Sequence, residues 1–228
     1  MDKLAFLNFI EGPFLNWLPR IFFGFVFILA AILYYRQKKQ LAGSFLHLTY
    51  KKLIIASVSF YILFAACLTW AQYYIWSQNK FTKLLLTTPL DQKALGEIFK
   101  HFSWLFKFKL GYFIIYVAER FWLEVLLVFV VTALFYFFLK SLSKYREEFF
   151  EPEELKLALL LGLIMGWPNF IVFLILSFVM VVLISIFNRF YFKEEYTTLS
   201  PAFLIAAGIT LLFDAKLLVM LNFTTLKV

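Results

Sequence analysis

The strongest constraint in this sequence is an uncharged run of 32 residues, from Leu157 to Asn188. A single straight helix of that length, at about 1.5 Å per residue, would exceed a hydrocarbon core about 30 Å thick. The run contains Gly166-Trp-Pro-Asn169, and proline removes a backbone donor and clashes with the preceding turn. The sequence therefore predicts a short apolar helix over Leu155–Gly166, a turn, and a membrane span over Phe170–Phe187.

The composition of the whole chain agrees with this. Of its 228 residues, 63% are hydrophobic and 16% are charged, whereas soluble domains have about 45–50% apolar and about 25% charged residues. Lipid admits only helices and closed barrels, and the apolar runs are far longer than barrel strands of about 10 residues. We expect an all-α, polytopic integral membrane helical bundle with five to six transmembrane helices and one interfacial amphipathic helix.

The spacing of charge and proline suggests the organisation of one membrane domain over residues 1–228. The interfacial helix is predicted over Gly96–Leu110, where apolar residues recur at helical spacing. The predicted parts are an interfacial N-terminal segment at 1–20, three spans within 21–139 with a long connector at 80–109, a charged loop at 140–156, and C-terminal helices at 157–228.

The net charge of +8 is distributed between the apolar runs. The loop over residues 36–52 carries five basic and no acidic residues, and loops of this kind face the cytoplasm. This places the N-terminus outside. Scattered basic residues suit lipid headgroups, so we expect the lipid bilayer and other membrane subunits as partners, and no nucleic acid. A bacterial or archaeal inner membrane is favoured, with an organellar inner membrane as the alternative.

The C-terminal part contains several motifs in a recognisable order. Lys156 precedes Gly162 and Gly166-Trp167, a long apolar span follows, and Pro201 opens the last helix. Over roughly residues 135–213 this order resembles the membrane part of the type IV prepilin peptidases. The resemblance implies an aspartyl peptidase with the motif Gly-x-Gly-Asp-x-Lys. Here Glu151-Pro-Glu-Glu154 replaces Gly-x-Gly-Asp, so both glycines are absent and a glutamate stands at the aspartate position.

Glu154 is the catalytic candidate that this resemblance indicates. An aspartyl peptidase needs two carboxylates that share a proton around a water molecule. No aspartate lies between Asp2 and Asp91 to act as the family's first one. The alternative is structural, because Glu153 and Glu154 follow Pro152 and acidic residues suit the first turn of a helix. This alternative favours a protein that is not an enzyme.

Charged residues also interrupt two of the predicted spans. Leu110–Leu139 contains Glu119, Arg120 and Glu124, of which the last two are four residues apart and share a helical face. Intramembrane charge marks substrate, lipid or proton sites. The alternative is an interfacial ion pair that contacts a neighbouring helix or subunit. Asp214 interrupts the last apolar helix, which either ends there or carries this residue into the membrane.

A second resemblance and the absence of other motifs complete the functional prediction. Arg120 and Glu124, with Leu199-Ser-Pro201, resemble features of the prolipoprotein diacylglyceryl transferases, although the His-Gly-Gly and Gly-Arg-x-x-Asn-Phe motifs of that family are absent. We find no phosphate loop or metal-ligand motif and expect no cofactor and no metal. The sequence favours a non-catalytic subunit or scaffold of a membrane assembly. The alternative is a membrane enzyme, either a prepilin-type peptidase using Glu154 or a lipid-modifying transferase, and a small-molecule transporter is third.

Overall fold

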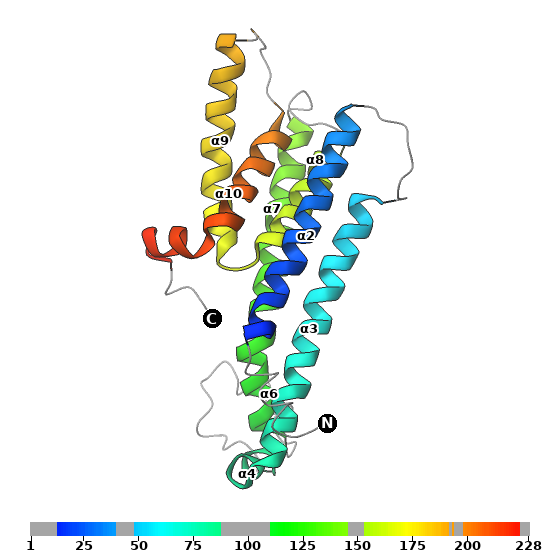
Figure 1. Ribbon diagram of the computed structural model, residues 1–228, viewed down its shortest axis with the longest axis vertical. Coiled ribbons are helices and arrows are strands. Elements are labelled where there is room, and N and C mark those ends of the chain that lie inside the picture. Colours follow the sequence, from blue (N-terminus) through cyan, green and yellow to red (C-terminus); the bar gives the residue numbers. More distant parts are fainter. Residues whose placement is uncertain are drawn as a thin grey trace. The chain divides into compact units, whose positions relative to one another are not determined.

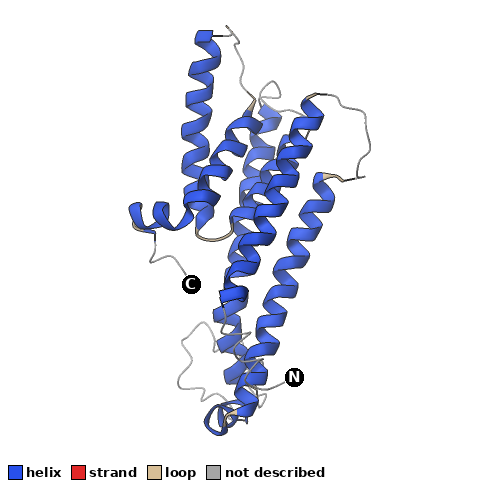
Figure 2. Cartoon of the chain, in the orientation of Figure 1, coloured by secondary structure: helices blue, strands red, loops and turns tan. Residues whose placement is uncertain are grey.

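The computed structural model describes residues 13–39, 48–87, 110–145, 153–191, 193 and 198–223, and all of its regular elements there are helices (Figures 1 and 2). The prediction of an all-α fold is confirmed. The elements are α2 (Pro13–Lys38), α3 (Tyr50–Gln78), α4 (Lys80–Thr87), α6 (Gly111–Val117), the π-helix η2 (Ala118–Trp122), α7 (Leu123–Tyr145), α8 (Glu154–Met165), α9 (Asn169–Tyr191) and α10 (Leu199–Met220).

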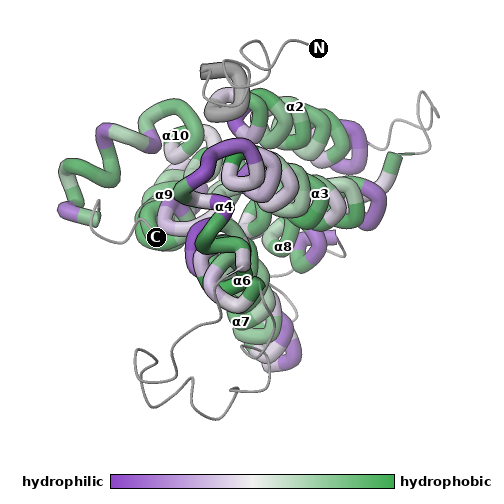
Figure 3. Tube along the Cα trace, turned by 90° about the horizontal axis from the view of Figure 1, so that it is seen from below, coloured by the Kyte–Doolittle hydropathy of each residue, from purple (hydrophilic) through white to green (hydrophobic). Residues whose placement is uncertain are grey.

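Five helical stretches of the described chain are long and apolar enough to cross a membrane. They are Trp17–Lys38, Tyr50–Gln78, Gly111–Tyr145, Asn169–Tyr191 and Leu199–Met220. The third joins α6, η2 and α7 into one helix of 35 residues. Figure 3 shows hydrophobic residues along α2 and α3 and hydrophilic residues at their ends. The chain is therefore a helical membrane bundle, and α8, with 12 residues, is an additional short apolar helix.

The charged loop predicted over residues 140–156 is helical at both ends. Helix α7 continues through Lys140 to Tyr145, and α8 begins at Glu154. Lys and Leu are good helix formers, so a charged residue near a membrane boundary does not end the backbone hydrogen bonding. The loop prediction was therefore too wide, and its residues 146–152 lie outside the described part of the chain.

The N-terminal boundary also differs from the prediction. Helix α2 begins at Pro13, inside the segment predicted to be interfacial, and continues through Pro19. Residues 1–12 lie outside the described part of the chain. The amphipathic helix predicted over Gly96–Leu110 also lies outside it, apart from Leu110, whereas the first part of the predicted connector forms α4.

The chain divides into two compact units. Unit 1 contains Tyr61–Leu126 and the N-terminal residues up to Leu15, and unit 2 contains Asn16–Phe60 and Leu127–Lys227. Helices α3 and α7 each begin in one unit and end in the other. The two units are described separately below.

The core of unit 1 is rich in aromatic rings from α3 and α6. Trp76, Leu86, Phe113 and Val117 are buried together, and Tyr116 packs against them. The ring of Trp76 lies edge-on to Phe113, with 5.4 Å between centroids, and 4.9 Å from Tyr116. Offset and edge-to-face pairs of this kind are the favoured aromatic geometry.

In unit 2, α8 and α9 form a helical hairpin. Helix α8 ends at Met165 and α9 begins at Asn169, so the break predicted at Gly166-Trp-Pro is confirmed. Gly166 has a φ of 64°, a conformation that glycine adopts without a steric penalty. Helix α10 then lies beside α9 (Figure 1). Helix α9 runs antiparallel to both α8 and α10 (Figure 1). Helices α8 and α10 therefore start at the same end of unit 2.

Gly162 allows α8 to approach α7 closely. A Cβ atom at this position would lie 2.9 Å from Cγ2 of Thr132 and 3.3 Å from the ring of Phe170. Nearby, Phe135 of α7 meets the rings of Phe170 and Phe203, with centroid distances of 5.4 and 6.0 Å. The helices of unit 2 thus combine a small residue at one contact with interlocking phenylalanine rings.

Candidate functional site

Glu154 lies at the first residue of α8 and is buried, with 2% of its surface exposed. Its position follows from the apolar sequence of α8, most of which is buried in unit 2. Its Oε1 atom accepts two hydrogen bonds from Ser200, one from the backbone N–H at 2.7 Å and one from the hydroxyl at 2.8 Å. Ser200 is itself 1% exposed, so the contact is shielded from solvent.

This contact caps the N-terminus of α10. The first N–H groups of a helix have no partner within the helix, and Ser200 is the second residue of α10. Thr198, at the N-cap position, makes no side-chain capping bond, and Glu154 supplies an acceptor instead. The carboxylate lies at the start of both α8 and α10, where the helix dipoles favour negative charge. Glu154 therefore connects two helix ends electrostatically.

The sequence-based alternative for Glu154, an acidic residue in the first turn of a helix, matches its position in α8. The neighbouring Glu153 is more exposed and forms an ion pair with Lys156 at 2.7 Å. What sequence reasoning missed is Ser200, which is 46 residues away from Glu154. The only local signal was the Ser-Pro pair at a helix start, and it does not say which acidic residue approaches.

The geometry around Glu154 limits its chemistry. The two hydrogen bonds from Ser200 engage Oε1, so in this arrangement the carboxylate serves as the acceptor for a helix end. A peptide substrate would also have to reach a side chain that α8 and α10 cover. Across the described residues, no three His, Cys, Asp or Glu side chains come together in a way that could hold a metal ion. His47 and His101 lie outside the described part of the chain.

The charged residues of the third span lie in unit 1. Glu119 and Arg120 belong to η2, Glu124 lies in the first turn of α7, and all three are exposed. The π-helical turn is marked by the N–H of Leu123, which bonds to the carbonyl oxygen of Ala118. A π-turn closes over five residues, and the expectation that Arg120 and Glu124 share a helical face stays a prediction.

The contacts of these residues differ from the predicted pair. Among the described residues, Arg120 belongs to no ion pair. Glu124 instead interacts electrostatically with Tyr61 of α3. The structure therefore brings Glu124 to α3 and leaves Glu119 and Arg120 on the surface of unit 1.

Helix length and one hydrogen bond describe the surroundings of these charges. Arg120 and Lys140 are 20 residues apart, or about 30 Å along a helix, which is about the thickness of the hydrocarbon core. Trp122 donates a hydrogen bond from Nε1 to Oγ1 of Thr69 at 3.1 Å, and exposed Trp70 follows Thr69. This contact joins η2 to α3 within unit 1.

Asp214, in unit 2, pairs with Arg20 of α2 at 3.0 Å. The guanidinium of Arg20 also lies 5.6 Å from the centre of the Trp17 ring. Phe213 has non-helical backbone angles (φ −120°, ψ 18°), and the last turns of α10 leave the axis of the helix at this point (Figure 1). Helix α10 thus bends next to Asp214 and continues to Met220, so it does not end there as one of the two sequence-based alternatives expected.

Comparison with protein-family models, with curated proteins and with solved structures finds no match to this chain.

Proposed function

We propose that this chain is a non-catalytic integral membrane protein that acts as a subunit or scaffold of a membrane assembly. The observation that supports this most directly is the contact between Glu154 and Ser200. The carboxylate is 2% exposed and accepts two hydrogen bonds that connect α8 to α10. A buried carboxylate that holds two helix ends in this way argues for a structural role.

The resemblance to the prepilin peptidases fits this proposal in one way: the chain would keep the helical framework of that family and lack its catalytic residues. Glu154 stands at the position of the family's aspartate, and Lys156, Gly162 and Pro201 keep their order. The family's reaction needs a second carboxylate close to the first. Here a serine hydroxyl and a backbone N–H contact Oε1, which supports a capping role for Glu154.

The assembly role is supported by the surface of η2. Glu119 and Arg120 are exposed within the long apolar helix Gly111–Tyr145. Charged groups in a membrane span are favourable sites for pairing with a second membrane protein, because an ion pair lowers the cost of leaving water. Irregular π-turns occur frequently at functional sites. We therefore propose that the contact with a partner subunit involves η2.

The non-catalytic part is tested with purified protein and a prepilin substrate. We expect no cleavage by the natural sequence and no difference for Glu154→Gln. Ser200→Ala is the matched variant, because it removes the hydroxyl from the same contact and keeps the carboxylate; both variants should lower the unfolding midpoint. Cleavage by the natural sequence that disappears in Glu154→Gln, with Ser200→Ala still active, would overturn the proposal.

The assembly part is tested by placing a photoreactive amino acid at Arg120 in the host membrane. Leu134, on the same continuous helix and 64% exposed, is the matched control. We expect a discrete cross-linked protein band from position 120 and none from position 134. Identical patterns from the two positions would show that η2 is not a specific partner contact.

A further inference from the structure

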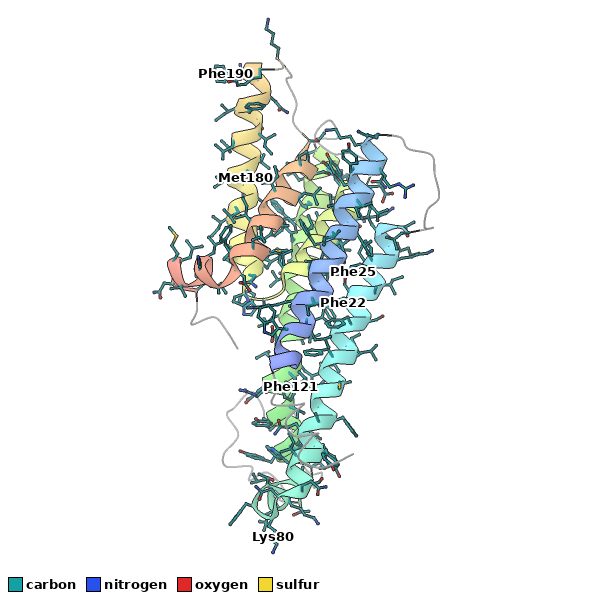
Figure 4. The ribbon with its side chains drawn as sticks, in the orientation of Figure 1. Phe22, Phe25, Lys80, Phe121, Met180 and Phe190 are labelled. Atoms are coloured by element: carbon teal, nitrogen blue, oxygen red, sulfur yellow. The ribbon has the colours of Figure 1, made fainter. Side chains whose placement is uncertain are left out.

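We propose that α4 is a membrane-surface anchor, in which Phe81 and Leu84 insert into the headgroup layer and Lys80 and Lys83 contact lipid phosphates. This inference is independent of the proposed function, because α4 contains neither Glu154 nor the charges of η2. Figure 4 shows Lys80 beside the C-terminal end of α3.

The orientation of α4 is fixed by capping contacts with the end of α3. The side-chain Oδ1 of Asn79 accepts the backbone N–H of Phe81 at 3.0 Å, and its carbonyl oxygen accepts the N–H of Lys83 at 2.9 Å. The hydroxyl of Thr82 donates to the carbonyl oxygen of Trp76 at 2.9 Å. These bonds make the turn between α3 and α4 well defined and prevent free rotation of α4.

The inner face of α4 is also fixed. Leu86 is buried with Trp76 and Phe113 in the core of unit 1, and Leu85 packs against that core. This leaves a defined outer face. Because α4 is held at both its capped end and its buried face, the side chains of the outer face do not turn inward.

The outer face of α4 combines large apolar groups with lysines. Phe81 is 88% exposed and Leu84 is 67% exposed. They are three residues apart, which places them on one side of the helix. Lys80 and Lys83 are exposed beside them. Helices that lie in a membrane surface have this combination of phenylalanine or leucine with basic residues.

Helix length places α4 at the membrane surface. Between Lys52 and Lys80 lie 27 uncharged residues, which as a helix extend about 40 Å, against about 40–45 Å for a bilayer with its headgroup layers. Helix α4 follows directly on a helix that is long and apolar enough to cross the membrane. The chain therefore enters α4 in the headgroup layer, where α3 leaves the membrane. Its lysines complement lipid phosphates, which favours lipid as the partner.

The experiment uses the full chain with Cys67, its only cysteine, replaced by serine. Two single-cysteine proteins are made, Leu84→Cys with Phe81 intact and Phe81→Cys with Leu84 intact. An environment-sensitive fluorophore is attached to the introduced cysteine. Leu134 serves as the reference in the apolar part of a span. Tyr145, 79% exposed at the end of α7, serves as the aqueous reference. The proteins are reconstituted in phosphatidylcholine vesicles with and without phosphatidylglycerol.

We expect a nitroxide on the lipid headgroup to quench the labels at Phe81 and Leu84. Aqueous iodide should quench these two labels several-fold less than it quenches the label at Tyr145. The label at Leu134 should respond best to a nitroxide deep in the acyl chains. The double variant Lys80→Gln/Lys83→Gln should raise iodide quenching at Leu84 in vesicles that contain phosphatidylglycerol. Iodide quenching at both α4 positions equal to that of Tyr145 in every vesicle would overturn the proposal. So would shielding that occurs only in host membranes, since a protein would then cover α4.

Discussion

Unit 1 and unit 2 are stabilised by different kinds of aromatic side chain. In unit 1 the central ring is Trp76, which contacts Tyr112 and Tyr116. In unit 2 the rings around α9 are phenylalanines, such as Phe135 and Phe173, with 6.3 Å between their centroids. Tryptophan and tyrosine have a polar group that needs a partner or water, whereas phenylalanine has none. The core of unit 1 therefore includes rings that carry polar groups, whereas the rings of the unit 2 cluster are purely apolar.

The polar contacts of the two units differ in the same way. Unit 2 contains a buried carboxylate, Glu154, whose Oε1 bonds to Ser200. In unit 1 the hydrogen bond from Trp122 to Thr69 is at the surface. Apolar lipid supplies little drive for helices to associate, so small residues and polar contacts assume that role in membranes. Gly162 and Glu154 together fulfil it in unit 2.

Replacing the central ring of unit 1 should have the largest effect. Trp76→Ala removes a side chain that is 7% exposed, and truncating a buried Trp costs about 3–5 kcal/mol. Unfolding in mixed detergent micelles measures the loss. The matched control is Trp70→Ala on the same helix, 59% exposed, which should cost far less. Equal losses from the two variants would mean that unit 1 has no aromatic core of its own.

The next effect concerns the polar contact of unit 2. Glu154→Ala leaves the N–H and hydroxyl of Ser200 without this acceptor, and losing a buried hydrogen bond to a charged group costs about 2–3 kcal/mol. Glu153→Ala is the control, because it removes only the solvent-exposed pair with Lys156, and such pairs contribute about 0–1 kcal/mol. The same unfolding assay compares them. A Glu153 variant as unstable as the Glu154 variant contradicts the capping role.

The smallest effect concerns the close helix contact at Gly162. Gly162→Ala places a Cβ atom 2.9 Å from Thr132, and overpacking of about 1–3 kcal/mol is partly offset by about 1 kcal/mol of helix propensity. We expect a net loss near 1 kcal/mol. Gly24→Ala is the control, because nothing lies within 4 Å of its added Cβ atom, so this variant should be neutral or slightly stabilised. If both variants gain stability, α8 does not depend on close approach to α7.

Much of the fold could be predicted from local sequence signals. The uncharged runs indicated α3 and α9, and Gly166-Trp-Pro indicated the turn after α8. The helix ends were less predictable. Helix α7, for example, continues past Lys140, because a lysine makes a segment more hydrophilic without ending its helix. The sequence contained no signal for the π-turn at η2.

The sequence by itself determined that this chain forms apolar helices and where proline and glycine interrupt them, because hydropathy and backbone preference act over a few residues. It also placed Glu154 at the start of a helix. Only the tertiary structure decided that Glu154 contacts Ser200, that Asp214 meets Arg20, and that Gly162 touches Thr132. These contacts join residues far apart in the chain. They exist because helices pack in one particular arrangement, which the pattern of apolar residues alone does not specify.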